Sequence, residues 1–324
     1  LDEVIGRTEL LRQVSRGAEH LDDLDLNPIL AKVDAPDSAR RFSIPTFRNE
    51  VPDSLDAQMI RDAKPVFERR EKMQLTYNVR NTHRAVGTRF SSEITRLYGM
   101  KDLAEDHVHV RLRGSAGQSL GAFLCQGITL EVFGDANDYV GKGLSGGTII
   151  VRPTVSSPLD SQHNSIIGNT VLYGATSGKL FAAGQAGERF AVRNSGAHVV
   201  VEGCGSNGLE YMTGGIAVIL GKVGSNFGAG MTGGMAFVLD PDDSFASNAN
   251  PESIVWQRLD SAHWEEQLKS LIMAHAHATD SAWSRSIIDD WDRRRGEFWQ
   301  ICPKEMLSRL AYPLSDKATL EAAE

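Results

Sequence analysis

Little in this 324-residue sequence points to metal binding, disulfides or membranes. The three cysteines, Cys125, Cys204 and Cys302, lie far apart, which excludes a disulfide framework and the usual spacings of zinc and iron–sulfur sites. No apolar run reaches the roughly 18 residues that a membrane-spanning helix needs. The first residues also lack the basic-then-apolar layout of a signal peptide. We therefore expect a cytoplasmic protein, with no membrane partner and with reduced, buried thiols.

Positive charge is also in short supply. Lys and Arg number 34 against 42 Asp and Glu, so the net charge is -8, and the basic residues form no stripe. Because nucleic-acid binding draws on clustered Lys and Arg, the sequence argues against a nucleic-acid partner. The chain begins with Leu1 rather than Met, so we expect it to be part of a longer polypeptide.

Glycine, in contrast, is abundant, with 31 residues concentrated in the middle of the chain. Gly203, Gly205 and Gly208 have the G-x-G-x-x-G spacing of a dinucleotide-binding loop. The apolar segment that follows, 216–220, is typical of a strand, whereas a dinucleotide site needs a helix there to hold the pyrophosphate. The expected acidic ribose partner about 20 residues further on is also missing. We therefore predict no dinucleotide site.

The glycines instead mark a repeat. Five segments superimpose without gaps and begin at Gly127, Gly146, Gly196, Gly214 and Gly233, with Gly178 beginning a weaker sixth. The usual step is about 18 or 19 residues, and the longer step after Gly146 contains a Pro- and Ser-rich insertion at 152–165, followed by a strand-like piece at 169–174. Because no helix fits inside this repeat, it predicts one coil of a parallel β-solenoid per unit.

Stacked coils should align equivalent side chains in columns. One inward column is Leu130, Ile149, Val199, Ala217 and Ala236, and a second is Val132, Val151, Val201, Ile219 and Val238. The residues between them, Glu131, Ile150, Val200, Val218 and Phe237, should face outward because strand side chains alternate. We name these five residues the outward column. Four of them are apolar, so we expect this chain's own helices or another domain to cover the column.

The sequence thus predicts a mainly β protein in three parts. Residues 1–113 form an N-terminal helical and linker segment with a few strands, residues 114–240 form the solenoid, and residues 241–324 form a helical tail. Apolar spacing predicts helices near the N-terminus, over 55–63, and over 263–278 and 283–299 in the tail, and strands over 73–79 and 107–114. The two tail helices should cap the open end of the solenoid.

No catalytic, cofactor-binding or metal-binding residue is predicted. Asp135, Asn137 and Asp138 suggest a calcium loop but lack its twelfth-position acid, so a turn is the better interpretation. His275 and His277 point to different faces of a predicted helix, and we expect both on its surface. The predicted structural ladder consists of Gly127, Gly146, Gly147, Gly178, Gly196, Gly203, Gly205, Gly214, Gly215, Gly233 and Gly234.

Several stretches carry a family resemblance. The segments LDEVIGRTELL (1–11), YNVRNTHRAVGTRFSSEI (77–94), GDANDYVGKGLSGGTIIVRP (134–153) and NFGAGMTGGMAFVLD (226–240) resemble the C-terminal region of the glutamate synthase large (α) subunit. The resemblance implies that the solenoid is a right-handed β-helix with the family's G-x-G-x-G motif. It also implies an enzyme that releases ammonia from glutamine and makes glutamate from 2-oxoglutarate on an FMN barrel fed by an iron–sulfur cluster, with both cofactors bound elsewhere in the subunit.

The resemblance further implies that the catalytic residues lie elsewhere in an oligomeric enzyme, with the small (β) reductase subunit as a partner. Because the apolar outward column needs a cover, our hypothesis is that this region is a non-catalytic scaffold that packs against the glutaminase and FMN-barrel domains. The electron donor, NADPH, NADH or ferredoxin, is left open. The alternative is a stand-alone G-x-G-x-G assembly subunit, similar to one in formylmethanofuran dehydrogenases, that recruits a partner through the outward column.

Overall fold

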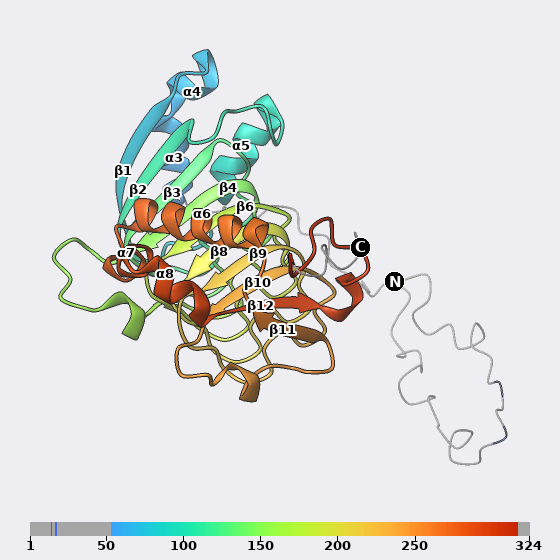
Figure 1. Cartoon of the computed structure of the whole chain (residues 1–324). Coiled ribbons are helices and arrows are strands. Elements are labelled where there is room, and N and C mark those ends of the chain that lie inside the picture. The colour runs from blue at the N-terminus through green and yellow to red at the C-terminus, as the bar shows by residue number, and fades with distance from the viewer. Residues whose placement is uncertain (1–13, 15–16, 18–52, 317–324) are drawn as a thin grey trace. The chain divides into compact units, whose positions relative to one another are not determined.

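A computed structural model describes residues 14, 17 and 53–316, and residues 53–316 belong to one compact unit (Figure 1). The helix predicted near the N-terminus falls almost wholly outside the described residues. The helices are α3 (Leu55–Asp62), α4 (Lys64–Arg69), α5 (Thr88–Tyr98), α6 (Ala262–Thr279), α7 (Ala282–Asp289) and α8 (Trp291–Arg294), with short 3-10 turns η2 (Ser161–His163), η3 (Phe245–Ser247), η4 (Arg295–Glu297) and η5 (Lys304–Met306).

The strands make one large sheet. They are β1 (Met73–Val79), β2 (Val108–Ala116), β3 (Ile128–Ala136), β4 (Ser145–Arg152), β5 (Ser165–Ile167), β6 (Ser177–Ala182), β7 (Gln185–Ala186), β8 (Ser195–Val201), β9 (Thr213–Ile219), β10 (Gly233–Leu239), β11 (Ile254–Arg258) and β12 (Phe298–Pro303). Within the described residues the order along the sheet is β1-β2-β3-β4-β6-β8-β9-β10-β12-β11, and the short strands β5 and β7 lie off this path.

The predicted fold class, a right-handed parallel β-helix between helical segments, is wrong. The structure contains a mixed, mostly parallel 12-stranded α/β sheet with flanking helices. The sheet begins before residue 114 with β1 and continues beyond residue 240 to β12 and β11, which pair antiparallel. The division into 1–113, 114–240 and 241–324 stays a prediction.

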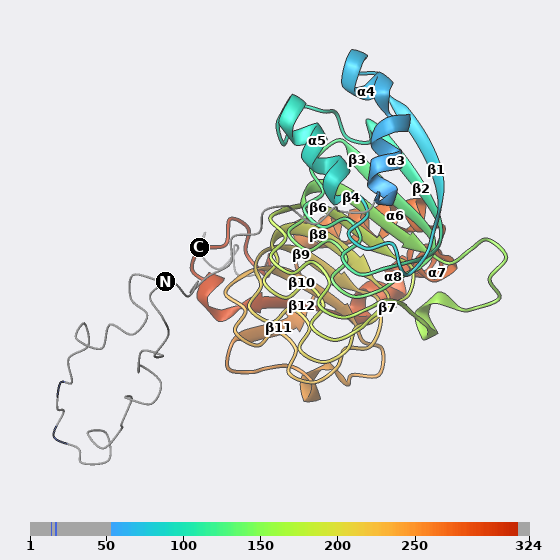
Figure 2. The same cartoon turned by 180° about the vertical axis from the view of Figure 1, so that it is seen from behind.

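The reason lies in the segments that return the chain from one long strand to the next. They stack on the face of the sheet away from α6, which is turned toward the viewer in Figure 2, and consist mainly of turns. Many residues in them have left-handed backbone angles, among them Tyr139, Leu172 and Leu209, and such angles interrupt an extended strand. The returning segments therefore contribute only short pairings such as β5 with β7 and the isolated bridge of Ala186 to Cys204. The piece at 169–174, expected to be strand-like, is one of these turns.

The spacing of the repeat nevertheless predicted the strand register correctly. Leu130 lies opposite Ile149, Val199 opposite Ala217, and Ala217 opposite Ala236. The weaker unit at Gly178 fits between them, with Leu180 opposite both Ile149 and Val199. Both inward columns are buried against the stacked turns, which forms the larger of two hydrophobic cores.

The smaller core lies on the other face of the sheet, under α6 and α7 (Figure 1). There Ile150, Val200, Val218 and Phe237 of the outward column are buried against apolar side chains of the two helices, including Leu268, Ile272 and Ile287. The chain's own helices therefore cover the four apolar residues of the outward column.

The C-terminal part differs from the prediction in two further ways. First, the tail helices pack on the sheet face, so the expectation that they cap the strand stack is wrong. The stack instead ends in β12 and β11, which sequence reasoning missed. Second, the region beginning at Trp283 is divided into α7, α8 and η4 before β12 begins at Phe298. At the N-terminal end the predicted helix α3 and strands β1 and β2 are confirmed, whereas α4 and α5 were missed.

Candidate functional site

The eleven predicted ladder glycines lie at the beginnings of β3, β4, β6, β8, β9 and β10, or flank the bridge at Cys204 beyond β8. Gly178 has φ +107°, in the region that side chains disfavour, and Gly127, Gly146, Gly215 and Gly234 also have positive φ. At Gly196 the constraint is steric, because a Cβ there would overlap the carbonyl oxygen of Thr176 on the preceding turn.

The packing predicts the effect of filling this space. Gly196→Ala should lower the free energy of unfolding by about 1–3 kcal/mol, because the backbone of the preceding repeat has to move. Chemical denaturation measures this change. The control is Gly296→Ala, since nothing lies within 4 Å of a Cβ at Gly296, and it should be neutral or slightly stabilising. Equal effects at the two positions would contradict a packing role for Gly196.

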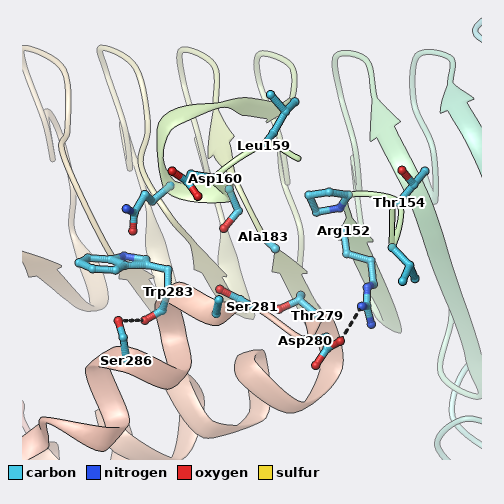
Figure 3. Close-up of a pocket in the computed structure, with 15 residues that line it drawn as sticks. Arg152, Thr154, Leu159, Asp160, Ala183, Thr279, Asp280, Ser281, Trp283 and Ser286 are labelled. Atoms are coloured by element: carbon cyan, nitrogen blue, oxygen red, sulfur yellow. Dashed lines mark hydrogen bonds and ion pairs between the residues drawn. The ribbon is translucent and has the colours of Figure 1, made fainter. Parts of the chain in front are cut away.

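A cavity of about 400 Å³ lies between the insertion after β4 and the beginning of α7 (Figure 3). Arg152, at the end of β4, donates a 3.1 Å bond to Asp280, which also pairs with Arg285. The Arg152 guanidinium lies 5.4 Å from the ring centre of Phe133. These interactions connect the sheet to the corner between α6 and α7. The charged side chains in this part of the cavity wall therefore have a structural role.

A buried polar cluster adjoins the cavity, which Ser281 lines. The Ser281 hydroxyl donates to Glu202 Oε1 at 2.5 Å, and His275 Nε2 lies 3.4 Å from the same oxygen. The expectation that His275 lies on the helix surface is wrong, because its exposure is 0%. Serine, histidine and carboxylate thus meet, but the serine donates to the carboxylate instead of to the imidazole. A serine nucleophile needs the opposite arrangement and access to substrate, so this cluster serves packing.

The thiols are equally unsuited to chemistry. Cys125, Cys204 and Cys302 are buried and unbonded to one another. Burial raises the pKa of Cys204 to about 12 and that of Cys302 to about 11, so both stay protonated at neutral pH. Among residues 53–316 no group of three or more His, Cys, Asp or Glu side chains is placed to hold a metal ion. In the same range no helix combines the length and apolar character needed to cross a membrane.

Asn137 and Asp138, considered above with Asp135 as a calcium loop, take part in turn hydrogen bonds. Asp138 Oδ1 accepts from the backbone N–H of Asn169 on the next turn, and Asn137 Oδ1 accepts from that of Asp138 within the same turn, both at 2.8 Å. Such bonds agree with the preference of Asn and Asp for turns. Asp135 lies at the end of β3 and accepts from the hydroxyl of Ser115 on β2 at 3.0 Å.

A larger groove of about 550 Å³ lies beside the C-terminal half of α6, above β2 to β8. Glu131 lies in it with only 7% of its surface exposed. Its carboxylate accepts from Arg111 Nε at 3.1 Å and lies 3.0 Å from His109 Nε2, while His109 Nδ1 lies 2.8 Å from Asp106. Glu131 thus faces outward as predicted but is shielded from solvent, and its charge is balanced by neighbouring cations.

Sequence reasoning missed this ionic cluster. The signal was present, because Arg111 lies directly opposite Glu131 in the register of β2 with β3. Extending the repeat back to β2 would have found it. The cluster also shifts the pKa values of its members. The pKa of His109 is raised, and the main cause is its hydrogen bond to Glu131. Burial raises the pKa of Glu131, but His109 and Arg111 outweigh burial and the net pKa is lowered.

The raised pKa of His109 makes a pH-dependent contribution to stability. The contribution is fully present below the unfolded-state pKa of about 6.5 and is lost as pH rises through the higher folded-state pKa. His109→Gln should therefore destabilise the protein more at about pH 6 than at about pH 8.5. Denaturant titrations at both pH values measure this, with exposed His163→Gln as the control. A His109→Gln effect that is constant or grows with pH would disprove the assignment.

Comparison with known proteins places this architecture in a family. The family model described as "GXGXG motif" matches residues 56–304, most of the chain. This chain belongs to the GXGXG family. The glycine repeat from which the strand register was predicted is thus a family feature.

The similar full-length proteins are glutamate synthases. The chain is 67% identical over 314 residues to the large chain of glutamate synthase [NADPH] from Azospirillum brasilense, covering 97% of this chain and 21% of that protein. It is 43% identical over 321 residues to the corresponding large chain from Bacillus subtilis (strain 168), covering 98% and 21%. It is also 43% identical over 310 residues to ferredoxin-dependent glutamate synthase 2 from Synechocystis sp., covering 94% and 20%.

The resemblance noted in the sequence is therefore confirmed at the level of a region. The chain spans about a fifth of the length of the curated relatives it matches. Relatives named for NADPH are 67% and 43% identical to it, and the one named for ferredoxin is 43% identical.

Proposed function

We propose that this chain is the structural region of a glutamate synthase large chain and holds the spacing of the domains that carry out the chemistry. The observation that carries the proposal is the 67% identity, which runs through 97% of the chain but covers only 21% of the relative. In that enzyme, glutamine, 2-oxoglutarate and reductant would give two molecules of glutamate, with the glutaminase and FMN-barrel domains as neighbours of this region in the same subunit.

The chemistry of the described residues supports a non-catalytic role. Ser281, Glu202 and His275 are buried, and the groove-facing His109 is paired with two carboxylates. The donor set does not fit an iron–sulfur cluster either, because the three thiols are buried separately and no metal-binding group occurs in residues 53–316. We therefore place FMN and the iron–sulfur cluster in other parts of the large chain.

The partner-recruiting role predicted from the sequence depended on an uncovered outward column, and α6 and α7 cover the apolar residues of that column. We therefore do not propose that this region recruits a partner through the outward column. Assembly with the small reductase subunit, formation of an oligomer and a cytoplasmic location remain part of the proposal through the similarity to glutamate synthase alone. Neither that similarity nor the fold favours a formylmethanofuran dehydrogenase-like subunit.

The proposal is tested in the complete enzyme with two variants that remove reactive-looking groups, Ser281→Ala and His109→Gln. The kcat for glutamate formation per folded enzyme should change less than about twofold, since the proposal gives neither group contact with a reacting atom. A loss of about 100-fold with unchanged thermal stability would show that this region is catalytic. The 324-residue chain by itself should neither hydrolyse glutamine nor show flavin absorbance.

The scaffold role has its own readout. Core variants that loosen the region, such as Val200→Ala, should raise the ratio of glutamine hydrolysed to glutamate formed, because domain spacing would be less well kept. Val155→Ala, at an exposed position, is the matched control. A ratio that stays constant while thermal stability falls would contradict the scaffold.

A further inference from the structure

Strand β1 forms an open edge of the sheet. It ends the strand order, and in Figures 1 and 2 it lies at the margin of the sheet with β2 on one side. The N–H of Met73 donates to His107 at 3.0 Å, which fixes the edge that faces β2. Backbone groups alternate along a strand, so the N–H and C=O groups of Gln74, Thr76 and Asn78 point the other way. Within the described residues no backbone group pairs with them.

The apolar side chains of β1 are also only partly covered. Met73, Leu75 and Tyr77 are only half-buried, although they pack against the larger core. Their register partners on β2, Val108, Val110 and Leu112, are completely buried. The difference between the two strands is that β2 has a neighbour on each side. One more strand beyond β1 would therefore bury these three side chains as well.

This edge also lacks the usual protection against strand pairing. The seven residues of β1 include no charged side chain and no proline, and the pairing with β2 is free of bulges. The opposite edge, β11, is treated differently. It carries the charged side chain of Arg258. The side-chain amide of Gln257 donates to the carbonyl oxygen of Leu314 at 2.8 Å, and an isolated β-bridge joins Asp260 to Ser315 just beyond the strand. The C-terminal segment thus contacts the β11 edge at two points, and β11 carries a charged side chain that β1 lacks.

We propose that β1 is completed by a β-strand from the part of the large chain outside these 324 residues. This inference rests on the proposed function, since about four fifths of the length of the relatives lies outside the matched region. That remainder has to meet this region somewhere. The outward column's apolar residues are covered by α6 and α7, and the C-terminal segment contacts the β11 edge, whereas β1 offers three unpaired N–H and C=O pairs beside half-buried apolar side chains.

A second copy of this chain is a poorer occupant. Two β1 strands pairing antiparallel about Thr76 would place Lys72 of one copy opposite Arg80 of the other, at both ends of the ladder. Both residues are exposed, and like charges directly opposite each other destabilise strand pairs.

Hydrogen exchange in the complete large chain tests the proposal without reference to activity. The amides of Gln74, Thr76 and Asn78 should exchange at least about 100-fold more slowly than in an unstructured peptide, because each would donate to the added strand. Exchange of these three amides at the unstructured rate, while Leu75 and Tyr77 are protected by β2, would overturn the proposal. The scaffold function could still stand in that case, because its test is the coupling ratio.

A proline variant and a cross-link identify the occupant. Thr76→Pro removes an N–H that β2 does not use, so it should abolish the protection of Gln74 and Asn78, whereas Thr76→Ala should keep it. A photoreactive benzoylphenylalanine in place of Gln74 should cross-link to residues outside this region in a product with the mass of one large chain. A cross-link to a second copy, or within the 324 residues, would overturn the assignment.

Discussion

Replacing Val218 with aspartate should strongly destabilise the protein. Val218 lies in the outward column between Val200 and Phe237, with 0% of its surface exposed, beneath α6. A carboxylate at this position would have no partner and would separate the helix from the sheet. We expect the free energy of unfolding to fall by about 4 kcal/mol or more, a large share of the about 5–15 kcal/mol that a domain has.

The matched control is the same substitution at an exposed valine. Val155, in the insertion after β4, is 86% exposed, and Val155→Asp should change stability by no more than about 0.5 kcal/mol. Circular dichroism and denaturant titration of both variants measure the difference. If Val218→Asp were as stable as Val155→Asp, the outward column would not be covered by α6, and it would again be open to a partner.

The second large effect should come from Glu202→Ala. This substitution leaves His275 Nε2 and the Ser281 hydroxyl buried without the oxygen that both contact. Removing one member of a buried polar pair costs about 3–5 kcal/mol, and we expect a loss in that range. The control is Glu105→Ala, which removes an ion pair with Lys179 whose side chains are 68% and 42% exposed, and which should cost less than about 1 kcal/mol.

A double substitution separates the lost partner from the lost volume. Glu202→Met combined with His275→Leu fills the site with apolar side chains and leaves no unpaired imidazole. It should be more stable than Glu202→Ala, because hydrophobic replacement of a buried polar pair is often close to neutral. A double variant that loses as much as the sum of the two single variants would mean that the residues act independently.

The residues of the candidate site were harder to predict from the sequence than the strands were. The absence of the usual metal and nucleotide patterns could be seen directly, but the cluster of Glu202, His275 and Ser281 joins residues more than 70 positions apart. No local pattern connects them, because the contact depends on how α6 and the start of α7 lie on β8. The pairing of Glu131 with Arg111 was within reach, since it follows the register of the repeat.

The sequence by itself determined which residues pair within the glycine repeat. A glycine-bounded apolar unit recurring about every 18 or 19 residues admits one register, because a shift by one residue would turn every apolar side chain to the wrong face. It also determined the family. Only the tertiary structure decided that the units build a mixed α/β sheet ending in antiparallel strands, that α6 covers the outward column, and that β1 is left open. Those outcomes depend on contacts between distant segments, and a local repeat carries no information about what packs on its outer face.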